Sequence, residues 1–354
     1  MTYTEKDRPV GQDESEDLVA RRPAIHDNFG REFTYLRVAL TDRCNLRCIY
    51  CMPEDGVAFS PAESLLTDEE ILRLVRICAD LGVRKLRFTG GEPLIRPNLS
   101  QLISEVSRTP GIEDVHMTTN GVLLAEQVAA LKQAGLTGLN ISIDTLKPDR
   151  FKHITRRAKL EQVLEGLAAA TVQEFNSLKV NVVALKGFND DEMADFAQLG
   201  KAVAITTRFI ELMPFDAHQI WKTGHFMGAD HIIARLKENF PDLIEAQGSA
   251  TEQHVFSVPA YRGKLAVIPA YTRSICGSCN RIRVTADGQL RNCLYSTQEY
   301  DLRSSLRADV GDAEIGAVIL DAMGTKLVDG WSAQRASQEQ TPTHLRDSMT
   351  QIGG

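Results

Sequence analysis

A regular alternation of strand-like and helix-like segments between residues 33 and 212 limits the folds that this chain can adopt. Short apolar runs predict strands, and the amphipathic stretches between them predict helices. Because each strand is followed by a helix and short connections, we expect the strands to be parallel. The predicted fold is α/β, an incomplete (βα)6 TIM-like barrel, which has fewer units than a complete barrel. The predicted strands cover residues 35–40, 85–89, 115–119, 139–143, 178–185 and 204–212, and the predicted helices cover residues 67–81, 99–107, 122–134, 160–174 and 191–201.

The two ends of the chain differ from this repeating part. Residues 1–28 are polar and acidic, which predicts a disordered extension. The partial barrel is assigned to residues 29–215 and a C-terminal region to residues 216–354. In that region we expect a helix at 231–239, a strand at 264–268, and a hairpin of residues 281–285 and 289–293 around Asp287-Gly288. This antiparallel element is expected to cap the barrel.

Several predicted strands carry polar residues on one face, although barrel strands usually fill the interior with apolar side chains. If the apolar face packs against the helices, the polar face points into the barrel. Buried Arg and Lys side chains need compensating charge, which an anionic ligand would supply. The alternatives are strands exposed on one side, or internal ion pairs with Glu92, Asp144 and Glu211. The polar faces comprise Arg37, Lys85, Arg87, Thr89, Asn140, Ser142, Asp144, Lys179 and Asn181.

A first group of cysteines directly follows the first predicted strand. Cys44, Cys48 and Cys51 are spaced C-x3-C-x2-C within one loop. Thiolates are soft ligands that suit zinc or an iron–sulfur cluster. A structural zinc ion needs four ligands, so zinc would require a distant fourth residue. A cubane cluster held by three cysteines leaves one iron open to a substrate or cofactor.

A second group lies near the predicted hairpin. Cys276 and Cys279 are followed by Cys293, which the hairpin brings back toward them. Three ligands again leave zinc and an iron–sulfur cluster as open alternatives. Arg281 and Arg283 lie between these cysteines on one strand face, where they could clamp a phosphate or simply be solvated. The seventh cysteine, Cys78, falls on the apolar stripe of a predicted helix and is interpreted as a core residue.

The first cysteine group and the segment Thr89-Gly90-Gly91-Glu92-Pro93 together resemble the radical S-adenosylmethionine (SAM) superfamily. Glycines in such a segment let the backbone approach a ligand closely. The whole arrangement resembles one family within it, the GTP 3′,8-cyclases of molybdenum cofactor biosynthesis. The resemblance covers nearly all of the chain after Phe33. It is carried by TDRCNLRCIYCMP, LRFTGGEPLIR, TTNG, ISIDTL, KVNVV, RFIELMP, CGSCNRIRV and the terminal Gly353-Gly354.

This resemblance implies a set of functional residues. Both cysteine groups would hold 4Fe–4S clusters, and a tail ending in Gly353 and Gly354 would enter the barrel and take part in catalysis together with Arg281 and Arg283. The implied SAM contacts are Tyr50, Gly91, Ser142 and Met213. The implied GTP contacts are Arg37, Arg87, Thr118, Lys179, Arg281 and Arg283, with Lys85 and Arg208 as additional candidates.

The implied reaction begins with an electron passed to the first cluster and the cleavage of SAM. The 5′-deoxyadenosyl radical then removes the 3′ hydrogen of GTP, and the ribose closes onto C8 of guanine to give 3′,8-cyclo-7,8-dihydro-GTP. The resemblance also implies an electron donor, whose identity the sequence does not give, and a downstream cyclic pyranopterin monophosphate synthase. A homodimer is left open. No G-x-x-x-x-G-K-[ST] loop occurs, so we expect side chains to grip the triphosphate.

Charge and hydropathy exclude other partners. The formal net charge of −7 argues against broad binding of nucleic acid or anionic membranes. We expect no membrane helix, because the sequence contains no apolar run long enough to span a bilayer. We also expect no secretory signal, and hence a cytoplasmic location, because the N-terminus has no basic region followed by an apolar one. Two alternatives stay open: a radical SAM enzyme that modifies peptides, which usually carries more C-terminal cysteines, and a zinc-stapled scaffold protein.

Overall fold

The computed structural model describes residues 24–213, 224–248, 254–339, 346 and 348–353. Within these residues the strands form one 12-stranded sheet in the order β12-β11-β10-β1-β2-β3-β4-β5-β6-β9-β8-β7. The strands are β1 (Tyr35–Ala39), β2 (Lys85–Thr89), β3 (Asp114–Thr119), β4 (Gly138–Ser142), β5 (Ser177–Ala184), β6 (Ile205–Glu211), β7 (Ile244–Ala246), β8 (His254–Ser257), β9 (Lys264–Ile268), β10 (Arg281–Val284), β11 (Gln289–Arg291) and β12 (Tyr300–Asp301).

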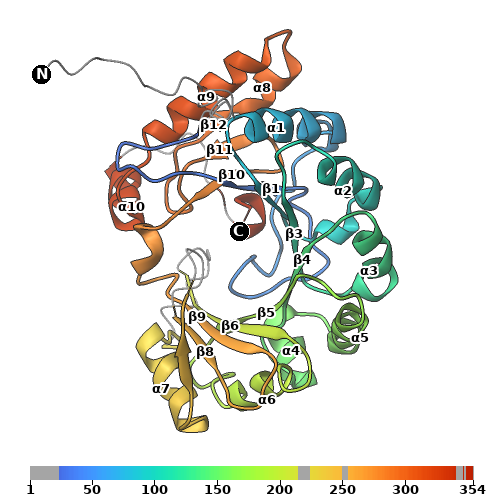
Figure 1. Cartoon of the computed structure of the whole chain (residues 1–354), viewed down its shortest axis with the longest axis vertical. Helices are drawn as coiled ribbons and strands as arrows, with labels where there is room; N and C mark the ends of the chain where they lie inside the picture. The colour runs from blue at the N-terminus through green and yellow to red at the C-terminus, as the bar shows by residue number, and fades with distance from the viewer. Residues whose placement is uncertain (1–23, 214–223, 249–253, 340–345, 347, 354) are drawn as a thin grey trace, which may run out of the picture.

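The sheet is curved and covered by helices on its outer side (Figure 1). The α-helices are α1 (Asp68–Asp80), α2 (Leu99–Ser107), α3 (Leu124–Gln133), α4 (Pro148–Thr155), α5 (Leu160–Thr171), α6 (Met193–Gln198), α7 (Ala229–Asn239), α8 (Leu302–Arg307), α9 (Asp312–Gly324) and α10 (Gly330–Glu339). Short 3-10 helices lie at Ala62–Ser64, Pro93–Ile95, Ser274–Cys276 and Met349–Gln351.

The predicted α/β fold is confirmed: β1 to β6 pair in parallel and fall within one residue or two of the predicted strands. Helix α1 begins as predicted at a capping box, in which the Thr67 side chain accepts from the backbone N–H of Glu70 while the Glu70 carboxylate accepts from the N–H of Thr67. Alternate strand residues face opposite sides. In β2, Leu86 and Phe88 are fully buried on the helix-facing side, and Arg87 lines the interior.

The C-terminal region extends the barrel in addition to forming the predicted hairpin. β10 and β11 are antiparallel, as Asp287-Gly288 predicts, but β10 also pairs in parallel with β1. At the other edge β9 pairs in parallel with β6. The parallel part therefore runs from β10 through β1–β6 to β9, and antiparallel strands flank it at both ends. The order does not close on itself, so the barrel is open.

The folded part also begins earlier than predicted. Residues 1–23 lie outside the described residues, but residues 24–28 belong to the fold. Ile25 is fully buried, and His26 forms an antiparallel bridge with Glu32. The prediction for residues 1–28 rested on their overall acidic composition, which does not reveal that one apolar residue, Ile25, is buried. Among the described helices, none combines the length and apolarity needed to cross a membrane.

Candidate active site

A cavity of about 680 Å³ lies within the curve of the sheet. The structure brings the predicted site residues together here, from β1 to β6, β10 and both cysteine loops, although their numbers span most of the chain. The lining includes Arg37, Cys44, Cys48, Tyr50, Cys51, Arg87, Gly91, Thr118, Ser142, Lys179, Met213, Cys276, Cys279, Arg281, Arg283 and Cys293.

The first cysteine loop leaves β1 and turns back against the barrel interior. The backbone N–H of Leu46 lies 3.4 Å from Cys44 Sγ, and Asn120 Nδ2 lies 3.7 Å from the same sulfur. Burial raises the pKa of the Cys51 thiol to about 12, so a bare thiolate is costly there. A metal cluster would supply the missing positive charge. Three thiols on one loop, facing one cavity, fit a cluster with an open iron.

Tyr50 and Asp144 form a buried pair beside this loop. The Tyr50 hydroxyl donates to Asp144 Oδ2 at 2.6 Å, and the backbone N–H of Val183 donates to Asp144 Oδ1 at 2.8 Å. Burial raises the pKa of Asp144 to about 6 despite these bonds. This hydrogen bond fixes the side chain of Tyr50, which lies between Cys48 and Cys51 in the sequence. The family resemblance implies that Tyr50 contacts SAM.

Gly91 is required by a close backbone approach. Its N–H donates to the carbonyl of Thr41 at 2.7 Å. A Cβ atom at position 91 would lie 2.0 Å from the carbonyl oxygen of Arg43. Because this is a backbone atom, no side-chain rotation can remove the clash. The glycine segment therefore packs directly on the strand-to-loop connection that carries the first cysteines. This contact fits a backbone cradle for a cofactor next to the cluster.

The second cysteine group has a different electrostatic setting. Burial alone would raise the pKa of Cys279, but Arg281, Lys326 and Arg283 lower it to about 6. The N–H of Gly330 lies 3.4 Å from Cys276 Sγ. The thiolate form is thus favoured at Cys279, whereas burial raises the pKa of Cys276. Among the described His, Cys, Asp and Glu side chains, no three converge as the ligands of a single metal ion would. A cubane needs no such convergence, because it binds each thiolate to a different iron.

Strand register builds a row of cations across the cavity wall. Arg283 of β10, Arg37 of β1 and Arg87 of β2 are direct neighbours in adjacent strands. Burial, together with Arg283, lowers the pKa of Arg37 to about 9, and burial with Arg281 lowers that of Arg283 to about 10. No side-chain carboxylate of the described residues forms an ion pair with Arg87, Arg281 or Arg283. This concentration of positive charge suits a polyanion.

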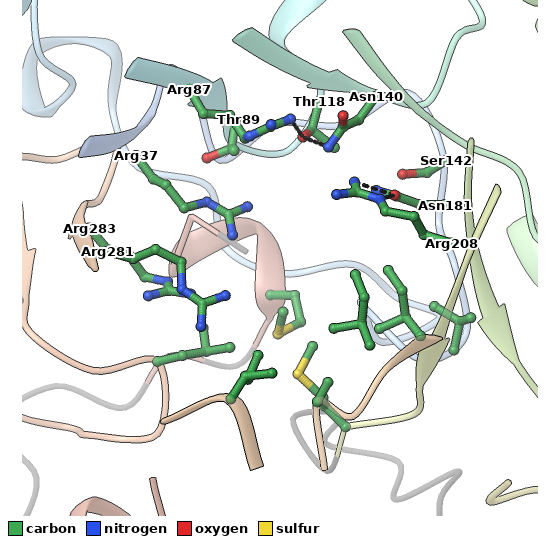
Figure 2. Close-up of a pocket in the computed structure, with 18 of the residues that line it drawn as sticks. Arg37, Arg87, Thr89, Thr118, Asn140, Ser142, Asn181, Arg208, Arg281 and Arg283 are labelled. Atoms are coloured by element: carbon green, nitrogen blue, oxygen red, sulfur yellow. Dashed lines mark hydrogen bonds between the residues drawn. The ribbon is translucent and has the colours of Figure 1, made fainter. Parts of the chain in front are cut away.

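Figure 2 shows Arg37, Arg281 and Arg283 on one side of the cavity and Arg208, Asn181 and Ser142 on the other. Arg208 Nε donates to Asn181 Oδ1 at 2.8 Å. Between these walls, Arg87 Nη1 donates to Thr118 Oγ1 at 3.2 Å. The cations therefore face a shared space from several sides, as a clamp for a charged ligand would.

The C-terminal segment lies inside the curve of the sheet (Figure 1). Ser348 Oγ donates to the carbonyl of Cys51 at 2.7 Å, and the N–H of Met349 lies 3.3 Å from the same oxygen. Gly353 packs against β1 and β2: a Cβ atom there would lie 3.4 Å from Ala39 Cβ and 3.6 Å from Thr89 Oγ1. The tail thus contacts the first cysteine loop. Gly354 lies outside the described residues.

Several cavity residues were not predicted as ligand contacts. Tyr35 and His116 hold Arg87, Asn120 approaches Cys44, and Lys326 faces Cys279. For Tyr35, the signal available in the sequence was its position two residues before Arg37 on the same strand face. Lys326 gave no signal, because it follows α9 and only the fold brings it to the second cysteine group.

Comparison with known families separates the chain into two matched parts. Residues 38–200 match the Radical SAM superfamily, and residues 205–329 match Molybdenum Cofactor Synthesis C. Together these matches span the parallel sheet, both cysteine groups and the Arg281/Arg283 strand.

Curated relatives match over nearly the whole chain. The GTP 3′,8-cyclase of Chlorobaculum tepidum is 42% identical over 336 residues, which cover 95% of this chain and 98% of that protein. The human Molybdenum cofactor biosynthesis protein 1 is 41% identical over 304 residues, 85% of this chain and 48% of that longer protein. Among solved structures, Streptococcus suis SuiB bound to precursor peptide SuiA has a TM-score of 0.58 at 11% identity, covering 84% of this chain and 65% of that one. This likeness supports the fold alone.

Proposed function

The chain belongs to the family of GTP 3′,8-cyclases within the radical SAM superfamily, and from this premise we propose that it converts GTP to 3′,8-cyclo-7,8-dihydro-GTP, the first step of molybdenum cofactor biosynthesis. One observation carries the proposal beyond family membership. A single cavity holds both cysteine groups and, between them, a row of buried guanidinium groups. Of this row, Arg87 and Arg283 form no ion pair with a carboxylate among the described side chains. A scaffold protein has no use for such a row, whereas a triphosphate requires it.

The cofactors are two 4Fe–4S clusters and SAM. Cys44, Cys48 and Cys51 would hold the first cluster, and Cys276, Cys279 and Cys293 the second. When bound, the first cluster supplies the electron that cleaves SAM, and the second offers an open iron near the substrate base. Tyr50, Gly91, Ser142 and Met213 are assigned to SAM.

The protein's own residues bind and orient the nucleotide. Arg37, Arg87, Thr118, Lys179, Arg281 and Arg283 are assigned to GTP, with the guanidinium groups on the phosphates and their geometry fixed by strand register. Holding ribose and cofactor in one geometry replaces an encounter in solution by a positioned reaction. The cavity wall would also limit the access of water and of unrelated C–H bonds to a reactive species.

The tail is assigned to the same reaction. Gly353 lies beside Thr89 on the strand that leads into the glycine segment, and Ser348 contacts the first cysteine loop. We propose that Gly353 and Gly354 complete the substrate side of the cavity, where residues without side chains leave room for the nucleotide. An electron donor and a downstream cyclic pyranopterin monophosphate synthase belong to the proposal through the family alone. A cytoplasmic location is proposed from the sequence, and a homodimer stays open.

The test is anaerobic turnover of the reconstituted protein. Protein loaded with iron and sulfide is reduced and given SAM with GTP, with ATP, or with no nucleotide, and 5′-deoxyadenosine and nucleotide products are followed. We expect cyclised product with GTP only. Cleavage of SAM with unchanged GTP would overturn the substrate and favour the peptide-modifying alternative. Failure to take up iron, with stoichiometric zinc instead, would overturn the radical SAM chemistry.

A further inference from the structure

Arg87 is held by three neutral acceptors on the cavity wall. Its Nε donates to the Tyr35 hydroxyl, its Nη1 to Thr118 Oγ1 at 3.2 Å, and its Nη2 lies 3.0 Å from His116 Nδ1. Each of the three nitrogens therefore has its own partner, from β1 and β3, the two strands that flank β2. A guanidinium bonded only to neutral groups has a fixed direction but keeps its full charge.

The bond to Arg87 also defines the state of the His116 ring. A guanidinium has no acceptor, so Nδ1 must accept and the ring proton must sit on Nε2. Nε2 faces Asp114 Oδ1 at 3.7 Å, and Asp114 in turn contacts Lys85 Nζ at 3.4 Å and the Thr137 hydroxyl at 3.1 Å. Burial, together with Arg87 and Lys85, lowers the pKa of His116 to about 3, in agreement with a neutral ring. The ring thus separates the carboxylate of Asp114 from Arg87.

The neighbouring strand is shaped around this imidazole. His116 is paired in register with Arg87 on one side and Gly138 on the other. A Cβ atom at position 138 would lie 2.4 Å from ring Cε1, 2.5 Å from Nδ1 and 2.6 Å from Nε2. Any other residue at 138 must displace the ring, so the glycine and the imidazole form a matched pair.

From these contacts we propose that His116 is a positioning residue for substrate binding: it accepts from Arg87 and fixes the guanidinium toward the nucleotide without neutralising it. A carboxylate in its place would bind Arg87 as well but would compete with the phosphates for its charge. This inference rests on the proposed function, because Arg87 is assigned there as a GTP contact. It adds a residue that does not itself touch GTP.

His116→Leu and His116→Asn separate positioning from packing. Leucine fills the site without an acceptor, whereas asparagine carries an oxygen where Nδ1 stands. Equilibrium binding of GTP to the cluster-loaded protein, without turnover, should weaken about tenfold in His116→Leu, as expected for one lost bond to a charged group. His116→Asn should stay within about threefold of the unsubstituted protein. SAM binding and iron content should be unchanged in both.

Gly138→Ala provides a second variant, which keeps histidine at position 116 but displaces its ring. We expect the same loss of GTP affinity as in His116→Leu, with SAM binding retained, and recovery in the His116→Asn/Gly138→Ala double variant, whose smaller side chain tolerates the Cβ atom. Equal GTP affinity in all variants, or parallel loss of GTP and SAM affinity, would overturn the positioning role. If the unsubstituted protein binds no GTP, the proposed function fails instead, so the two outcomes are distinguishable.

Discussion

Individual side chains in the cavity have pKa values set by what surrounds them, so identical residue types differ sharply. Cys51 is partly buried and Cys279 is buried, yet the pKa is about 12 for the first and about 6 for the second. The difference is due to the cations around Cys279, which outweigh its burial. A thiolate next to Arg281 and Lys326 is ready to bind iron, whereas Cys51 must lose its proton as the cluster forms.

Replacement of Arg283 tests the row of cations formed by Arg283, Arg37 and Arg87. Arg283→Ala removes a buried cation that register places beside Arg37. We expect both clusters and SAM cleavage to persist, and KM for GTP to rise at least about tenfold, as the loss of a charged phosphate contact produces. The matched control is Arg235→Ala, at an exposed arginine that forms an ion pair with Glu238 on helix α7. Unchanged GTP affinity would remove this strand from the substrate site.

The neutral imidazole of His116 predicts a pH dependence of stability. Its folded pKa of about 3 lies below the ordinary value of 6.5, so its contribution is present above pH 6.5 and is lost as the pH falls toward 3. The groups that face it are Arg87, Lys85 and Lys179, which disfavour the imidazolium, and Asp114, which favours it.

The measurement compares the unsubstituted protein with His116→Asn, which does not titrate. Between pH 7 and pH 5 the free energy of unfolding should fall by roughly 2 kcal/mol more in the unsubstituted protein. Denaturant midpoints at the two pH values provide the comparison. Parallel pH profiles for the two proteins would contradict a neutral buried ring.

At the scale of elements, one ion-pair group anchors the tail to the hairpin. Arg346 Nη2 lies 3.0 Å from Asp287 Oδ2, in the turn between β10 and β11, and 2.8 Å from Glu299 Oε2. Glu299 is nearly fully buried and also lies 3.5 Å from Arg291 Nη1. The hairpin that carries Arg281 and Arg283 therefore also positions the segment leading to Gly353.

Arg346→Gln should release the tail while leaving the barrel folded. Arg291 remains beside Glu299, so we expect a loss of stability of only about 1–2 kcal/mol. Hydrogen exchange of residues 348–353 should increase, and cyclisation should fall as it does when Gly353 and Gly354 are deleted. Normal turnover in the deletion variant would show that the tail is dispensable, and unchanged exchange in Arg346→Gln would show that the anchor lies elsewhere.

The parts of this architecture that the sequence predicted are those governed by local periodicity. The six central strands, the capping box at Thr67 and the Asp287-Gly288 hairpin all depend on residues a few positions apart. The pairing of β10 with β1 joins Arg281 to Tyr35. These residues are far apart in the sequence, so no local pattern predicts that their strands pair. The same limit explains why the cysteine groups could be named from spacing and resemblance, whereas the His116–Gly138 match required the register of β3 and β4.

At the scale of the molecule, Arg31 joins three distant segments. Its Nε contacts Asp27 Oδ2 at 2.6 Å, and its Nη atoms donate to the carbonyls of Cys276, Leu327 and Val328 at 2.8–2.9 Å. The first folded residues, the second cysteine loop and the segment before α10 are therefore held by one guanidinium. This link connects the N-terminal segment to the region that would hold the second cluster.

Arg31→Met should destabilise this junction because Asp27, itself buried, loses its partner. A loss of about 3 kcal/mol is expected from an unpaired buried charge. Chelators should also extract iron from the second cluster faster than from the first. The double variant Arg31→Met/Asp27→Asn should recover part of the stability, since no charge is left unpaired. Identical unfolding midpoints for Arg31→Met and the unsubstituted protein would exclude the link.

The row of Arg283, Arg37 and Arg87 also makes substrate occupancy part of the folding equilibrium. Like charges held side by side in a buried wall repel one another, and this repulsion is an internal stress on the folded state when no counterion is bound. A polyanion that enters removes the stress and binds the native state alone, so each factor of ten in its concentration above Kd adds about 1.4 kcal/mol to stability. The nucleotide is then both reactant and counterion, and its concentration contributes to the free energy of unfolding of the barrel.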